Sequence, residues 1–260
     1  MENKKKHGIN AVLVISRRAQ TIAFILLIAL IFYAVNCPAI VGVTATTRLL
    51  PIYSVETESK KVALTFNAAW DNSDIQQLID ILDEYDVKTT FFMVGDWVDK
   101  YPKSVKLLYE AGHEIMNHSD THAHFSSLST DSIIDDIKSC NDKIERITGV
   151  RPTLFRAPYG EYDDHVIAAV ESIGMRAIQW DVDSVDWKGL SAEEIANRVT
   201  GRISPGSIVL FHSGAENTPE ALPDIIEYLL GEGYEIVPVS ELIIKEGYTI
   251  DHTGRQYPAR

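Results

Sequence analysis

Residues 61–94, KVALTFNAAWDNSDIQQLIDILDEYDVKTTFFMV, contain the pattern on which the rest of the chain is built. Their first part, Lys61–Phe66, is an apolar run of the kind that forms a buried strand. Between Ser73 and Tyr85, apolar residues recur three and four positions apart, which is typical of a helix with one buried face. A second strand-like run, Thr89–Val94, follows. This order predicts two parallel strands joined by a crossover helix.

The same alternation continues along the chain. Further strands are expected at residues 113–116, 153–156, 175–180, 207–211 and 234–238. Further helices are expected at residues 97–111, 132–148, 164–173, 191–202 and 218–230. Seven strands that alternate with helices predict a parallel sheet of the α/β class. In closed barrels of this class, chemistry collects at the carboxyl ends of the strands.

The ends of these strands hold residues that can do chemistry. They are Asn67, Trp70, Asp71 and Asp74 after the first strand, His118 and His122 after the third, Arg156 and Tyr159 after the fourth, Asp181, Asp183, Asp186 and Trp187 after the fifth, and His212 after the sixth. A His-x-x-x-His spacing alone is weak evidence for a metal site, because eight histidines are scattered over 260 residues. Reactive residues at five strand ends are harder to explain as structure alone, and they predict one shared site.

Charge is distributed unevenly along the chain. The formal net charge is −13, residues 1–20 carry +4, and the remainder therefore carries −17. Binding to nucleic acid requires clustered Lys and Arg, so an acidic domain argues against nucleic acid as a partner. A hydrophobic content of 45% is typical of a globular protein with a sizeable core.

The basic residues at the amino end precede a long apolar segment. No charged residue lies between Arg18 and Arg48, and the centre of this stretch reads IAFILLIALIFYAV. This predicts a basic cytoplasmic segment at residues 1–20 and a membrane segment at 21–45. The segment is either an uncleaved signal anchor, which we favour, or a signal peptide cleaved near residues 43–45. Both place the acidic domain outside the cytoplasmic membrane, either anchored to it or secreted. A linker is expected at 46–60, the domain at 61–250 and a short tail at 251–260.

Five short motifs at the strand ends occur in a characteristic order. They are Thr65-Phe66-Asn67, His118-Ser119-x-x-His122, Arg156-x-Pro158-Tyr159-Gly160, Asp183-x-x-Asp186-Trp187 and Leu210-x-His212. In this order, over roughly residues 61–241, the chain resembles the NodB-homology polysaccharide deacetylases, carbohydrate esterase family 4. The resemblance implies a distorted (β/α)7 barrel. It also implies a hydrolase acting on carbon–nitrogen bonds other than peptide bonds, which removes acetyl groups from N-acetylated sugars such as those of peptidoglycan or chitin.

The resemblance assigns roles to individual residues. His118 and His122 match ligands of a divalent metal, for which zinc or cobalt is expected. His212 matches the acid that protonates the leaving amine, and Asp183 matches the residue that orients His212. Arg156 matches the residue that keeps the general base ionised.

Three further positions match the pocket that receives the acetyl group. The backbone amide of Tyr159 matches a donor to the developing oxyanion. Trp187 and Leu210 match residues that line the acetyl pocket, although ordinary core packing would explain both equally well.

The first motif departs from the family pattern. The family usually has Asp as the base where this chain has Asn67, and a second Asp as metal ligand where it has Ala68. The chain continues with Trp70, as in a subgroup that resembles sporulation-associated deacetylases. Asp71 and Asp74 could substitute for a missing carboxylate, or they could simply be acidic residues favoured at the start of a helix.

Two functions therefore stay open. One is an extracytoplasmic N-deacetylase that uses metal-assisted attack by water. The other is a catalytically impaired pseudoenzyme that binds cell-wall glycan. The partners expected for both are an N-acetylated cell-wall polysaccharide and the cytoplasmic membrane, and the sequence indicates no protein partner.

Overall fold

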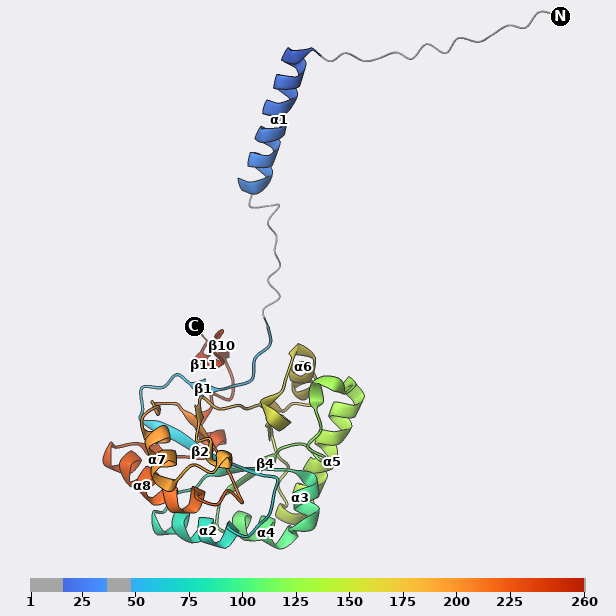
Figure 1. Cartoon of the computed structure of the whole chain (residues 1–260). Coiled ribbons are helices and arrows are strands. Elements are labelled where there is room, and N and C mark those ends of the chain that lie inside the picture. Colours follow the sequence, from blue (N-terminus) through green and yellow to red (C-terminus); the bar gives the residue numbers. More distant parts are fainter. Residues whose placement is uncertain (1–15, 37–47, 260) are drawn as a thin grey trace, which may run out of the picture. The chain divides into compact units, whose positions relative to one another are not determined.

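The computed structural model describes residues 16–36 and 48–259, which belong to two separate units (Figure 1). The first unit contains helix α1, Arg17–Asn36, whose apolar side chains are exposed, Phe24 at 63% for example. Across the described ranges, no helix is both long and apolar enough to cross a membrane. The cleavage site considered at 43–45, the end of the predicted membrane segment and most of the basic segment at 1–20 lie outside the described residues.

The second unit is built on a parallel sheet. Its path is β6-β5-β4-β3-β2-β8-β7, with β9 also pairing with β2. The strands are β2 Lys61–Ala68, β3 Thr90–Met93, β4 Glu114–Asn117, β5 Leu154–Phe155, β6 Arg176–Ala177, β7 Val182–Asp183, β8 Ile208–His212 and β9 Glu235–Ile236. Each neighbouring pair is parallel, which confirms the α/β class and the crossover connections predicted from the sequence.

The sheet is a half-barrel in which β6 and β7 form the two edges of the strand path. A single strand was expected at 175–180, but within that range the structure has only the short strand β6, and a separate short strand, β7, follows it on the opposite edge of the sheet. Between them, Ile178 pairs with Ile52 in an isolated bridge, and the backbone amide of Gln179 donates to the Ile52 carbonyl. The Ile178 amide still donates to the Phe155 carbonyl of β5 at 2.8 Å, whereas the Gln179 amide donates to the amino-terminal segment, so the pairing with β5 ends at this point.

Helices surround the sheet, as Figure 1 shows for α2, α4, α5 and α8. They are α2 Ile75–Glu84, α3 Gly95–Lys100, α4 Pro102–Glu110, α5 Thr130–Thr148, α6 Asp164–Ser172, α7 Ala192–Thr200, α8 Thr218–Gly231 and α9 Val239–Leu242. The helix expected at 97–111 is divided into α3 and α4 at Tyr101. Pro102 is the reason, because proline disfavours helical geometry in the residue before it and is readily accommodated in a first helical turn.

Strand β2 lies at the centre and separates the core from the site. Successive side chains of a strand point to opposite faces. Phe66 points into the helix-covered core, where its ring stacks on Phe91 at 4.8 Å and on Phe211 at 5.4 Å between centroids. Its neighbours Thr65 and Asn67 lie on the other face, and Asn67 is in register with His212 of β8.

The segments at both ends of the domain differ from the sequence expectation. Strands β1 (Ser54–Val55), β11 (Arg255–Pro258) and β10 (Tyr248–Ile250) form a small second sheet. Ile52 is 1% exposed and Val55 is 2% exposed, so this part of the expected linker 46–60 is core. The expected tail 251–260 supplies β11. These residues fold onto the domain because their apolar side chains and backbone groups find partners there.

Candidate active site

A pocket of about 390 Å³ lies at the carboxyl ends of the central strands. Its lining residues are Asn67, Ala69, Trp70, His118, His122, Tyr159, Gly160, Trp180, Asp183, Trp187, Leu210 and His212. Most residues singled out from the sequence are therefore brought together. The residues singled out from the sequence that do not line the pocket are Asp71, Asp74, Arg156, Asp181 and Asp186, and of these Arg156 is fully buried.

His118 and His122 place two neutral imidazoles in the pocket. His118 follows β4 and is 1% exposed, and burial lowers its pKa well below the ordinary value. Its Nδ1 lies 2.8 Å from the carbonyl oxygen of Arg156, which can only accept, so Nδ1 carries the proton and Nε2 is left unprotonated. The centroids of the His118 and His122 rings are 5.0 Å apart, and burial also lowers the pKa of His122.

The loop that carries the two histidines is held in an unusual conformation. Ser119 and His122 have positive φ angles of 70° and 55°, which non-glycine residues adopt at a cost. The Ser119 hydroxyl accepts from the His122 amide at 2.8 Å. From helix α5, the Asp136 carboxylate accepts from the Asp120 amide at 2.7 Å and from the Thr121 hydroxyl at 2.8 Å. These contacts stabilise the conformation that presents His122.

The two imidazoles are not joined by a carboxylate. Asp71 accepts from the amide and hydroxyl of Ser73, and Asp74 accepts from the amide of Gly214 at 2.7 Å. In the part of the chain that the structure describes, no three His, Cys, Asp or Glu side chains are grouped to hold a metal ion. Asp71 and Asp74 are thus not brought to the histidine pair, contrary to the metal-ligand role considered for them. The residues present do not fit a site of one Asp and two His.

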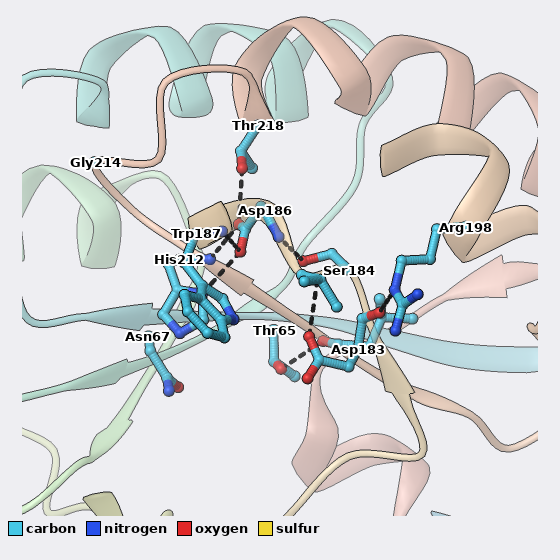
Figure 2. Close-up of polar contacts among 12 residues, drawn as sticks. Thr65, Asn67, Asp183, Ser184, Asp186, Trp187, Arg198, His212, Gly214 and Thr218 are labelled. Atoms are coloured by element: carbon cyan, nitrogen blue, oxygen red, sulfur yellow. Dashed lines mark hydrogen bonds and ion pairs between the residues drawn. The ribbon is translucent and has the colours of Figure 1, made fainter. Parts of the chain in front are cut away.

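His212 is oriented by Asp186, not by Asp183 as the sequence motif suggested. The Asp186 carboxylate accepts from His212 Nδ1 at 2.8 Å, from the His212 amide at 2.7 Å and from the Thr218 hydroxyl at 2.7 Å. Asp186 is 3% exposed. Figure 2 shows Asp186 between Thr218 and His212, with Asp183 apart from both. A histidine whose Nδ1 is held this way keeps Nε2 for proton transfer in the pocket.

Asp183 instead shapes the loop that delivers Asp186. Its Oδ1 accepts from the amide of Val185 at 2.8 Å, and Val185 has a φ of 58°, which is rare for a β-branched residue. The Ser184 hydroxyl accepts from the Asp186 amide at 3.3 Å. Both aspartates stand in the same motif, and the sequence does not show which of them reaches His212, because that depends on this backbone turn.

Arg156 is a buried cation that has no carboxylate partner within residues 16–36 and 48–259. Its Nη1 donates to Thr65 Oγ1 at 2.9 Å and to Asn67 Oδ1 at 3.0 Å, and its Nη2 donates to the Gln179 carbonyl at 3.1 Å. Its Nε has no hydrogen-bond partner in the described part of the chain, and burial lowers the pKa of Arg156 to about 9. The Phe92 ring lies 4.1 Å from the guanidinium carbon. Arg156 therefore contacts position 67, as the resemblance implied, but meets an amide there.

Aromatic side chains form the rim of the pocket. The Trp70 ring stacks on the His212 ring at 5.1 Å and 11°, a role that sequence reasoning did not assign to it. Trp187 is 51% exposed and Tyr159 is 62% exposed, whereas Leu210 is 3% exposed. Core packing therefore does not explain Trp187, while Leu210 both packs in the interior and lines the pocket. Exposed aromatic faces beside a pocket that also holds polar side chains suit the apolar faces of a sugar ring.

Comparisons with known proteins agree with this geometry. A family model described as polysaccharide deacetylase matches residues 54–178. A peptidoglycan-N-acetylglucosamine deacetylase of Bacillus cereus is 33% identical over 186 residues, covering 70% of this chain and 68% of that protein. This chain belongs to the polysaccharide deacetylase family. The family's members are hydrolases that act on carbon–nitrogen bonds.

Two further relatives of this deacetylase-family chain bear on its activity. The peptidoglycan-N-acetylmuramic acid deacetylase PdaC of Bacillus subtilis is 34% identical over 73% of this chain, which spans only 40% of the length of PdaC. The crystal structure of BA3943 from Bacillus anthracis, described as a CE4 family pseudoenzyme, has a TM-score of 0.72 and 36% identity, covering 75% of this chain and 69% of that one. A mutant of BA3943 is described as having restored enzymatic activity.

Proposed function

We propose that this protein binds N-acetylated cell-wall glycan in the pocket, and that Asn67 holds hydrolysis of the acetamide to a very low rate. The observation that carries the proposal is the contact between Arg156 and Asn67. Arg156 Nη1 donates to an amide oxygen where a general base would require a carboxylate. An amide does not accept a proton near neutral pH, so water in this pocket has no base at position 67.

Other parts of the deacetylation machinery are present. His212 can donate a proton from Nε2 to a leaving amine, and the Asp186 carboxylate stabilises the imidazolium form before that transfer. Trp70, Trp187 and Tyr159 surround the opening where a sugar would lie. A pocket that has an acid and an aromatic rim but no carboxylate at position 67 supports binding together with suppressed turnover.

The change Asn67→Asp tests this proposal. It adds a carboxylate beside Arg156 with almost no change in shape, and the adjacent guanidinium should keep that carboxylate ionised. We expect little or no acetate release by the wild type and a rate about 10²-fold higher for Asn67→Asp, the usual effect of a positioned base. The substrates are N-acetylglucosamine oligomers and peptidoglycan, with zinc or cobalt added. Asn72→Asp is a matched control, because Asn72 lies outside the pocket and contacts Ser104.

The experiment has three informative outcomes. Substantial wild-type activity that Asn67→Asp does not improve would mean that another residue acts as the base, and Asp183 is the carboxylate that lines the pocket. Binding of the oligomers without hydrolysis by either form would support a purely glycan-binding protein. Absence of both binding and hydrolysis would refute the proposal.

We infer from the sequence that the domain acts outside the cytoplasmic membrane. Support comes from the uncharged apolar stretch between Arg18 and Arg48 and from the basic residues before it. External protease should digest the domain in cells stripped of their wall but otherwise intact. Protection of the domain until the membrane is lysed would contradict this location.

A further inference from the structure

Asp74 is a buried carboxylate that the chemistry described above does not use. It precedes helix α2 at the position where an aspartate normally caps the helix, but its side chain makes no capping hydrogen bond. Its Oδ2 instead accepts from the amide of Gly214, which lies 140 residues along the chain, at 2.7 Å. The residue is only 8% exposed.

This arrangement is costly for Asp74. Its Oδ1 is buried and has no hydrogen-bond partner among the described residues. Burial, together with the nearby charges of Asp71 and Asp186, raises the pKa of Asp74 to about 6, against the lowering effect of the Gly214 amide. A carboxylate placed where its charge is penalised, instead of at the helix end that it could cap, is more consistent with positioning a partner than with stabilising the fold.

The partner of Asp74, Gly214, lies in the turn that follows β8. Three successive amides at the end of β8 are each held by a different group. The His212 amide donates to Asp186 at 2.7 Å, the Ser213 amide donates to the Asn67 carbonyl at 3.0 Å, and the Gly214 amide donates to Asp74. Figure 2 places Gly214 on the turn just beyond His212.

The backbone conformation of Gly214 leaves little room for the turn to move. Gly214 has a φ of +84°, and a Cβ added there would lie 3.3 Å from a carboxylate oxygen of Asp71. The chain at Gly214 is therefore confined between the α2 amino end and the β8 end. Without the Asp74 contact, the amide of Gly214 would have no carboxylate to fix its direction.

We propose that Asp74 is a positioning residue for His212. With Asp186 on one side and Asp74 on the other, the backbone of residues 212–214 is clamped, and His212 keeps Nε2 directed into the pocket against Trp70. This inference rests on the proposed function, because it concerns the residue that would act as the acid there.

The test uses the Asn67→Asp protein, in which turnover is expected, with Asp74→Ala added. Small displacements of a catalytic group can cost up to about 10²-fold in rate. We expect Asp74→Ala to lower kcat at least about tenfold and to leave KM within about twofold, because His212 moves while the sugar-binding rim does not. Asp74→Asn should recover part of kcat, since its amide oxygen can still accept from Gly214. Asp80→Ala is the matched control, because Asp80 is an exposed aspartate on helix α2 that accepts a hydrogen bond from Gln76 at 2.8 Å, away from the pocket.

A second readout does not depend on activity. In the wild-type protein, the ring resonances of His212 and the amide resonance of Gly214, measured by NMR, should shift in Asp74→Ala and stay unchanged in Asp80→Ala. Unchanged His212 resonances, or an unchanged kcat in the active background, would overturn the positioning role. If Asn67→Asp releases no acetate, the role proposed for Asn67 in suppressing hydrolysis fails, and the resonances still decide whether Asp74 positions His212.

Discussion

At the scale of single residues, Arg156 donates to the amide oxygen of Asn67, where the proposed function would need a carboxylate for hydrolysis. Arg156 is fully buried, and its hydrogen bonds are made to a hydroxyl, an amide oxygen and a carbonyl. Hydrogen bonds to neutral groups stabilise a buried charge less than a carboxylate would. The charge of Arg156 is therefore stabilised only by neutral groups among the described residues, although a carboxylate would stabilise it better.

A double-mutant cycle at these two positions measures that mismatch. Arg156→Met in the wild type removes a charge that has no counter-ion, so we expect the free energy of unfolding to change by less than about 2 kcal/mol. The same change in the Asn67→Asp protein strands a carboxylate and should cost about 3–5 kcal/mol. Urea unfolding of the four proteins gives the coupling. A coupling below about 0.5 kcal/mol would show that the two side chains do not form a pair.

Asp74 predicts a pH dependence of stability. Its folded-state pKa is raised to about 6 from an ordinary value of 3.8, so its ionised form is penalised by folding. Its contribution to stability is fully present below about pH 4 and is lost as the pH rises through 6. Asn does not titrate, so the free energy of unfolding of Asp74→Asn relative to wild type should increase from pH 4 to pH 8, by up to about 3 kcal/mol at 1.36 kcal/mol per pKa unit. A difference that stays constant with pH would contradict the raised pKa.

At the scale of elements, two short loops decide what the site presents. The loop after β4 carries the imidazole pair, with positive φ at Ser119 and His122, and helix α5 holds it through Asp136. The loop after β7 carries Asp186, with positive φ at Val185. In both loops a strained backbone conformation places a side chain of the site, which is common at functional sites.

The histidine loop predicts weak metal binding. Two imidazoles without a carboxylate should bind zinc or cobalt, but weakly, because the third protein donor is missing. Calorimetric titration should give heats for the wild type that vanish in the His118→Ala, His122→Ala double mutant. Asp136→Ala should weaken binding further by loosening His122, and Asp135→Ala, on the exposed side of the same helix, should not. Equal heats for wild type and double mutant would remove the site.

At the scale of the whole molecule, the ends of the domain are tied together. The segment before β2 and the last residues of the domain form the sheet β1-β11-β10. Ile52 and Val55 from the first segment are buried in a cluster with Phe92 and Met116, which belong to the central sheet. The residues expected to be a linker thus contribute to the core on which the site rests.

Truncation tests this contribution. A chain that begins at Arg48 should fold, whereas a chain that begins at Lys61 loses two fully buried side chains, worth about 3–6 kcal/mol together. Thermal unfolding of the two chains should show a much lower melting temperature for the shorter one. Equal melting temperatures would mean that residues 48–60 pack on the domain without stabilising it.

The sequence by itself determined the α/β class, the parallel pairing and the edge of the sheet where the site lies. Strand and helix periodicities are local, and the carboxyl ends of parallel strands necessarily share one edge. It also showed that position 67 lacks a carboxylate. The family resemblance implied that Arg156 would pair with a carboxylate at that position. These statements need only the order and the types of residues.

Only the tertiary structure decided which side chains meet. Asp186, and not Asp183, reaches His212 across 26 residues, and Asp74 reaches Gly214 across 140. These pairings depend on loop conformations such as the positive φ of Val185, and no periodicity encodes them. The shortening of the strand expected at 175–180 to Arg176–Ala177 has the same origin, because Ile178 pairs with Ile52, which lies more than 120 positions away in the chain. Contacts between distant segments are set by packing, and packing is a property of the whole fold.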